Sequence, residues 1–134
     1  MNFISDQLQQ YIDDHSMEES DLLKALDRET HKKVLQPRML SGSYQGRLLA
    51  LLAKMIGPKK ILEVGTYTGY ATLCMAEGLT TDGLIDTIDH NEELADMQRR
   101  YFDQSPYGSQ IVQHLGEAKD LSLIHISEPT RRKR

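Results

Sequence analysis

The sequence predicts an α/β fold in which N-terminal helices are followed by three parallel strands, the first half of a doubly wound sheet. Two observations support this fold class. Apolar residues recur every three or four positions through residues 1–56, which is typical of helices that bury one face. From residue 60 onward, short apolar runs alternate with helical stretches of about 10–15 residues, a pattern typical of parallel strands joined by right-handed crossovers.

Three helices are expected before the sheet. Apolar positions between residues 3 and 12 predict the first helix. Ser16 and Glu19 have the spacing of a capping box, which predicts that the second helix begins there. The third is expected over 44–56, because a glycine and a proline follow it directly and a glycine often ends a helix in the left-handed conformation.

Helices are also expected after each of the first two strands. A turn bounded by Gly65 and Gly69 leads into one helix, in which Tyr70 and Cys74 are expected to pack in the core. Asn91 is a candidate N-cap for the next helix. The strands themselves are expected over 61–64, 84–89 and 111–115.

Composition and charge exclude several functional classes. The chain has 134 residues, 39% hydrophobic and 27% charged, which suits one globular domain. It has no apolar run near the roughly 20 residues of a membrane-spanning helix, and its polar start is unlike a signal peptide, so we expect a cytoplasmic protein without membrane contact. The net charge is −4, and residues 121–134 contribute +3 to it through four basic groups and one acid. Residues 1–120 therefore carry −7, which argues against nucleic-acid binding.

Three features fall at the carboxyl ends of the predicted strands, where open α/β sheets bind ligands. Gly65 and Gly69 bound the turn after the first strand, Asp89 ends the second, and 116–118 (Gly-Glu-Ala) follow the third. A single acid at a strand end is more often a solvated charge, and a single glycine there is usually only a turn. The ordered set predicts a nucleoside site in which Asp89 accepts hydrogen bonds from ribose hydroxyls.

The glycine spacing distinguishes between nucleoside cofactors. A nicotinamide-binding turn requires G-x-G-x-x-G, whereas this turn has glycines only at its first and fifth positions. It lacks the glycine that lets a pyrophosphate approach the backbone closely. The turn therefore favours a nucleoside without phosphates.

The sequence resembles the catechol and caffeoyl-coenzyme A type of S-adenosylmethionine-dependent O-methyltransferase (EC 2.1.1), particularly its bacterial members. Four segments carry the resemblance in order over roughly residues 16–120: ETHKKVLQPRMLSGSYQGRLLALLAKMIGPKK, ILEVGTYTGYATLCMAEGL, TIDHNEEL and HLGEAKD. It implies a Rossmann-like methyltransferase sheet that binds S-adenosylmethionine. The candidate cofactor-binding residues are Ser41, Glu63, Gly65, Thr66, Tyr67, Gly69, Ala71, Asp89, His90, Glu117 and Ala118.

The resemblance also implies roles for these residues. Glu63 and the backbone of 65–67 would hold the methionine portion, with Ser41 at its amino-acid end. Asp89 would bind the ribose, and 117–118 would lie beside the adenine, with His90 near the ring or simply on the surface. Ala71 stands where some relatives have a serine. For Glu63 the sequence adds its own argument, since a carboxylate within an apolar strand is costly to bury unpaired.

In this family Mg²⁺ orients two adjacent hydroxyls of a small-molecule acceptor, either catechol-like or a coenzyme A-linked phenol, and the full-length enzyme is expected to be a homodimer. The family's metal-binding segments follow a fourth strand that this sequence lacks, so we assign it no catalytic and no metal-ligating residue. The resemblance implies a partial methyltransferase domain over 1–120, comprising N-terminal helices (1–56) and a cofactor-binding βαβαβ unit (57–120). We expect this truncated chain to be inactive by itself.

Residues 121–134 (LSLIHISEPTRRKR) do not resemble the family and are expected to be an artefactual, adaptor-like read-through. The alternative is a genuine basic tail for targeting or nucleic-acid binding. Two other functions stay open for the whole chain. One is a fragment of a nicotinamide-dependent oxidoreductase, and the other is a non-catalytic helical dimerisation module built on residues 1–56.

Overall fold

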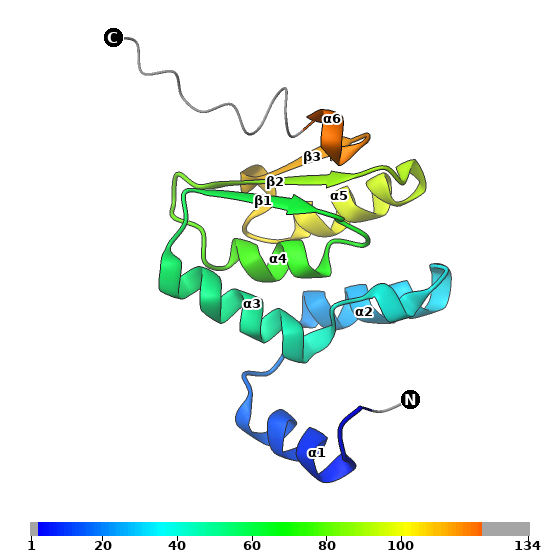
Figure 1. Ribbon diagram of the computed structural model, residues 1–134, viewed down its shortest axis with the longest axis vertical. Coiled ribbons are helices and arrows are strands. Elements are labelled where there is room, and N and C mark those ends of the chain that lie inside the picture. Colours follow the sequence, from blue (N-terminus) through cyan, green and yellow to red (C-terminus); the bar gives the residue numbers. More distant parts are fainter. Residues whose placement is uncertain (1–2, 122–134) are drawn as a thin grey trace.

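A computed structural model describes residues 3–121 as helices packed on a three-stranded sheet (Figure 1). The first three α-helices precede the sheet, as predicted. The elements are α1 (Asp6–His15), α2 (Asp21–Lys33), η1 (Pro37–Met39), α3 (Gly42–Ile56), β1 (Lys60–Val64), α4 (Tyr70–Ala76), β2 (Leu84–Asp89), η2 (Glu92–Leu94), α5 (Ala95–Gln104), η3 (Gly108–Gln110), β3 (Ile111–Leu115) and α6 (Ala118–Leu121), where η marks a short 3-10 helix.

The predicted parallel sheet is confirmed. Strand β2 lies between β1 and β3 and pairs with both in parallel. The bounds of β2 and β3 agree with the predicted ranges, and β1 begins one residue earlier than predicted, at Lys60. All three strands end at the same edge, which brings the segments that follow them together.

The two faces of the sheet differ in burial. Ile61, Ile85 and Ile111 are partners in register on the face that α4 and α5 cover, and the last two are almost fully buried (Figure 1). On the other face Leu62 and Val64 of β1 are 44% and 64% exposed. Among residues 3–121, β1 pairs only with β2, so it forms the expected exposed apolar edge, a feature that favours aggregation.

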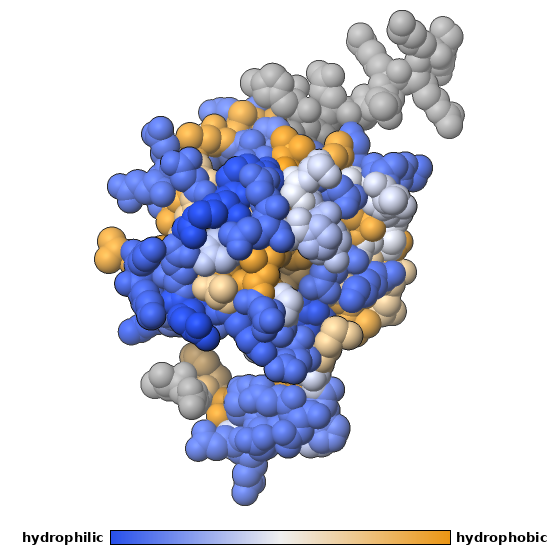
Figure 2. Space-filling view, turned by 180° about the vertical axis from the view of Figure 1, so that it is seen from behind, coloured by the Kyte–Doolittle hydropathy of each residue, from blue (hydrophilic) through white to orange (hydrophobic). Residues whose placement is uncertain are grey.

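Helices α2 and α3 share one hydrophobic core with the sheet. Leu26 and Ala50 pack in the same buried cluster as Tyr70 and Cys74, both of which were predicted to be core residues. Gly46 lets α3 approach α4 closely, because a Cβ there would lie 2.7 Å from the Cys74 sulfur. This shared core disfavours an independent helical module over residues 1–56. By contrast, α1 buries no residue and projects from the rest of the chain. The face seen in Figure 2 is largely hydrophilic.

Three predicted helix starts need correction. Helix α2 begins at Asp21, because the Ser20 hydroxyl accepts a hydrogen bond from the Leu23 N–H at 3.2 Å, while Ser16 instead follows the end of α1. Glu19 forms no capping box, since its carboxylate accepts the hydrogen bond of the buried Tyr70 phenol. Helix α3 begins two residues earlier than predicted. Asn91 does act as an N-cap, but of the short η2, which leads into α5.

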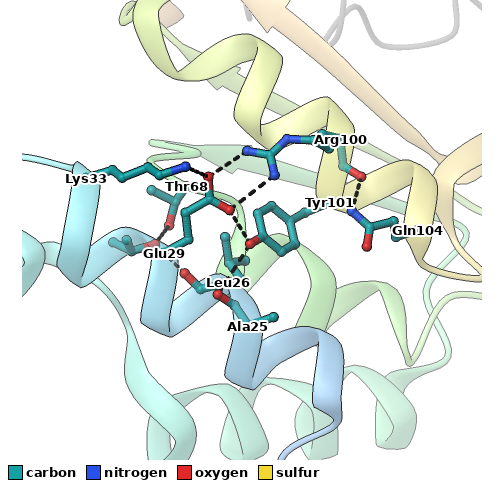
Figure 3. Close-up of polar contacts among 9 residues, drawn as sticks. Ala25, Leu26, Glu29, Lys33, Thr68, Arg100, Tyr101 and Gln104 are labelled. Atoms are coloured by element: carbon teal, nitrogen blue, oxygen red, sulfur yellow. Dashed lines mark hydrogen bonds and ion pairs between the residues drawn. The ribbon is translucent and has the colours of Figure 1, made fainter.

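A polar cluster around Glu29 joins α2 to α5 (Figure 3). The Glu29 carboxylate accepts hydrogen bonds from Arg100 Nη2 at 2.7 Å, from Lys33 Nζ at 3.1 Å and from the Tyr101 phenol. Hydrogen bonds from Arg100, and then from Tyr101, lower the pKa of Glu29 from 4.5 to about 2. The folded state therefore favours the ionised form of Glu29.

This shift predicts a pH dependence of stability. Because the pKa of Glu29 is lower in the folded chain, its contribution is present above about pH 4.5 and is lost as the pH falls towards 2. We expect Glu29→Gln to reduce the free energy of unfolding at pH 6 and to flatten its decline between pH 5 and pH 3, measured by urea unfolding. The control is Glu92→Gln, since the exposed Glu92 makes no side-chain hydrogen bond with residues 3–121. If the free energy of unfolding fell equally in the wild type and in Glu29→Gln between pH 5 and pH 3, the lowered pKa of Glu29 would be contradicted.

Candidate ligand site at the carboxyl ends of the strands

A cavity of about 740 Å³ opens at the carboxyl edge of the sheet, where the sequence predicts a nucleoside site. Six of the eleven candidate residues line it, namely Gly65, Tyr67, Asp89, His90, Glu117 and Ala118. The cavity is also lined by residues from the end of α2 and from η1, between positions 33 and 39, none of which was predicted from the sequence. Its further lining residues are Lys33, Val34, Leu35, Gln36, Met39, Val64, Ile88, Asn91, Glu93, Leu94 and Gly116.

The two glycines of the β1–α4 turn have different surroundings. Gly65 has a φ of +95°, and a Cβ there would meet no atom within 4 Å, so the backbone beside the cavity is unobstructed. Gly69 has a φ of +94°, but a Cβ there would lie 2.5 Å from the Phe102 ring. Gly69 therefore allows the turn to pack on α5, whereas Gly65 leaves room for a ligand.

Asp89 ends β2 with its carboxylate held by backbone groups of both flanking loops. One oxygen accepts a hydrogen bond from the Tyr67 N–H at 2.8 Å and the other from the Asn91 N–H at 3.0 Å. The side chain is 14% exposed and lines the cavity. Since each carboxylate oxygen can accept two hydrogen bonds, Asp89 retains acceptor capacity for ligand hydroxyls.

Tyr67 connects the turn to three other parts of the structure. It has a φ of +51°, which is unusual for a residue other than glycine. Its N–H donates to Asp89, and its carbonyl accepts from Gln98 Nε2 at 2.6 Å. The phenol donates to the carbonyl of Gln36 at 3.0 Å, or to that of Leu35 at 3.3 Å, and so contacts the segment between α2 and α3.

Glu63 lies in β1, two residues before Gly65, and does not line the cavity. Burial raises the pKa of its carboxyl, as does the nearby Asp89, while hydrogen bonds from Thr72 and Thr87 oppose the shift. The Thr87 hydroxyl donates to Glu63 at 2.6 Å. Threonine hydroxyls therefore act as partners of the buried carboxylate within the fold, and a role of Glu63 in cofactor binding stays a prediction.

Three other candidates, Thr66, Ser41 and Ala71, also lie outside the cavity lining. Thr66 is buried, with its hydroxyl 2.6 Å from that of Thr87. Ser41 immediately precedes α3, and Ala71 lies in the first turn of α4. Their roles in cofactor binding, like those of the cavity residues, stay predictions.

Gln98 and the segment from Lys33 to Met39 were not predicted from the sequence to belong to the site. A glutamine on the buried side of an amphipathic helix, four residues after Leu94 and three before Tyr101, was a detectable signal because buried polar side chains need partners. The segment offered only Pro37 as a sign that the helix ends before it.

Residues 3–121 have neither a metal-binding cluster nor a membrane-spanning helix. No group of three or more His, Cys, Asp or Glu side chains in this part of the chain is arranged to hold a metal ion. None of its helices is both long and apolar enough to cross a membrane. The predicted non-family tail lies outside the described residues except for Leu121, which ends α6.

The parallel sheet, with helices packed on it and a cavity at its carboxyl edge, has the architecture of part of a Rossmann-like domain. The sequence profile of the O-methyltransferase family matches residues 13–128, and the chain belongs to that family. This finding confirms the resemblance and disfavours the nicotinamide-dependent oxidoreductase.

Individual relatives agree with the family match. The chain is 42% identical over 91 residues to caffeoyl-CoA O-methyltransferase 1 of Zea mays, covering 66% of this chain and 35% of that protein. It is 31% identical over 120 residues to a catechol O-methyltransferase of Niastella koreensis, covering 90% and 54%. An O-methyltransferase from Bacillus cereus, solved in complex with SAH (S-adenosylhomocysteine), has a TM-score of 0.80 and 27% identity over 92% of this chain and 56% of that one. The chain thus spans about a third to a half of these curated relatives.

Proposed function

We propose that the chain is the cofactor-binding part of an S-adenosylmethionine-dependent O-methyltransferase and that the cavity binds this cofactor. The observation that carries the proposal is the position of Asp89, at the end of β2 and in the wall of a 740 Å³ cavity, with free acceptor capacity. The SAH complex of the Bacillus cereus relative supports the same ligand class.

Each part of the cofactor has a candidate contact in this chain. Asp89 would accept the two ribose hydroxyls, and the backbone of Gly65 and Tyr67 would hold the methionine portion. Glu117 and His90 line the part of the cavity nearest to the ends of β3 and β2, where the adenine would lie. The bound cofactor would supply the sulfonium methyl group that the acceptor hydroxyl receives.

The molecule that accepts the methyl group would be bound by the full-length enzyme. By family resemblance we propose a small molecule with a catechol-like or coenzyme A-linked phenolic hydroxyl, methylated in the cytoplasm by a homodimer. The net charge of −7 over residues 1–120 argues against a nucleic acid in this role. The family's Mg²⁺ does not fit residues 3–121, which offer no suitable ligand cluster, so we assign the metal to no residue of this chain.

Calorimetric titration of the purified 134-residue chain with SAH and with NAD⁺ tests the proposal. We expect SAH to bind and NAD⁺ to bind at least about tenfold more weakly, because the turn lacks the glycine that admits a pyrophosphate. Equal or tighter binding of NAD⁺ would contradict the proposed cofactor. So would the absence of SAH binding by a chain whose folding is verified by circular dichroism.

A further inference from the structure

Gln98 of α5 contacts the turn between β1 and α4, although it does not line the cavity. Its side chain is buried, with 3% exposure, and both ends of its amide are hydrogen-bonded. The Nε2 group donates to the Tyr67 carbonyl at 2.6 Å, and Oε1 accepts from Gln113 Nε2 at 2.8 Å. Gln98 thus joins the middle of β3 to the turn after β1.

The orientation of the Gln98 amide is determined by its neighbours. Gln113 Nε2 also donates to the Ala95 carbonyl at 3.1 Å, so Gln113 presents its NH₂ group to α5. Gln98 must therefore direct its oxygen towards Gln113 and its NH₂ group towards Tyr67. A side chain without a donor at position 98 would leave the Tyr67 carbonyl without this hydrogen bond.

The Tyr67 peptide needs such support because its conformation is unfavourable. A left-handed φ is sterically unfavourable for a residue with a side chain, because it brings the Cβ close to the following carbonyl oxygen. In this conformation the Tyr67 N–H reaches Asp89 while its carbonyl reaches Gln98. The two hydrogen bonds hold the peptide units on both sides of the Tyr67 Cα, and one of them ends on the proposed ribose-binding carboxylate.

We infer that Gln98 is a positioning residue for cofactor binding, which holds Tyr67 in the left-handed conformation and thereby orients the Asp89 carboxylate towards the cavity. Gln113 orients Gln98 in turn. This inference rests on the proposed function for its effect on affinity, whereas its effect on the turn itself can be measured without a ligand.

The test compares Gln98→Leu with Gln110→Leu in the full 134-residue chain. Gln110 is a matched control, because its Nε2 likewise donates to loop carbonyls, in this case those of Thr80 and Gly83, both at 2.9 Å. This loop precedes β2, at the opposite end of the sheet from the cavity. Both substitutions should lower the melting temperature, since each removes hydrogen bonds from partly or fully buried carbonyls.

Amide hydrogen exchange measured by NMR reports on the turn without a ligand. We expect exchange of the Tyr67 N–H to accelerate at least about tenfold in Gln98→Leu and to stay unchanged in Gln110→Leu. We also expect Gln98→Leu to weaken SAH binding about tenfold and Gln110→Leu to leave it within twofold, measured by calorimetry below the melting transition.

Two further variants keep the inference falsifiable if Gln98→Leu does not fold. Gln98→Glu keeps an acceptor for Gln113 but, when ionised, has no donor for the Tyr67 carbonyl, so it should accelerate Tyr67 exchange as Gln98→Leu does. Gln113→Leu should have a smaller effect. Unchanged Tyr67 exchange in Gln98→Glu, or equal losses of SAH affinity in the position-98 and position-110 variants, would overturn the inference. If Tyr67 exchange is faster in Gln98→Glu but the wild-type chain does not bind SAH, only the proposed function is refuted.

Discussion

Replacement of Asp89 by alanine is expected to weaken SAH binding by roughly ten- to a hundred-fold. Two ribose hydroxyls that donate to one carboxylate form charge-assisted hydrogen bonds, worth on the order of 1.5–3 kcal/mol each at best. The same carboxylate accepts the backbone N–H groups of Tyr67 and Asn91, so its removal also releases the turns that follow β1 and β2. Both effects lower affinity, and calorimetric titration of the variant measures their sum.

Asp86→Ala is the matched control. Asp86 lies three residues earlier on β2, on the opposite face of the sheet, where its carboxylate is 2.8 Å from His114 Nε2. Its replacement removes the contact with His114 and should change SAH affinity little. A loss equal to that of Asp89→Ala, or larger, would show that the cavity residues have been misassigned.

Asp89→Asn separates the two contributions. An asparagine retains one oxygen, which can accept the Tyr67 N–H, but has no negative charge for the ribose hydroxyls. We therefore expect an affinity between those of the wild type and Asp89→Ala. An asparagine variant as weak as the alanine variant would indicate that charge, and not the support of the turn, dominates the effect.

Local patterns in the sequence were sufficient to predict the sheet and the edge at which the cavity opens. The ranges 84–89 and 111–115 are short apolar runs bounded by turn residues, so their ends were defined locally. Asp89 was predicted in the cavity because it ends such a run, and the carboxyl ends of parallel strands lie together.

The contacts that support the site could not be predicted, because they join residues far apart in the sequence. The pairing of Gln98 with Tyr67 spans 31 positions, and that of the Tyr67 phenol with the Gln36 carbonyl spans 31 in the other direction. The start of α2 was mispredicted for a similar reason. Glu19 has the spacing of a capping-box partner, but the Tyr70 phenol, 51 positions away, binds its carboxylate.

Gly69→Ala is expected to destabilise the folded chain by about 2–5 kcal/mol. An alanine at a φ of +94° costs about 1–2 kcal/mol in backbone conformation. Its Cβ would also lie 2.5 Å from the Phe102 ring, which is fully buried, and overpacking of this kind typically costs about 1–3 kcal/mol. Since small domains are stable by only about 5–15 kcal/mol, much of the variant is expected to unfold on mild heating.

Gly65→Ala isolates the conformational part of this cost. Gly65 has nearly the same φ, +95°, but a Cβ there would meet no atom within 4 Å, so we expect a loss of only about 1–2 kcal/mol. Urea unfolding of both variants without ligand measures the difference, and equal losses would mean that the Phe102 contact contributes nothing. The expected inequality implies that the two glycines of the turn have separate functions. Gly69 lets the turn pack against α5, which carries Gln98, and Gly65 leaves the backbone beside Asp89 open to the cavity in which we propose that the cofactor binds.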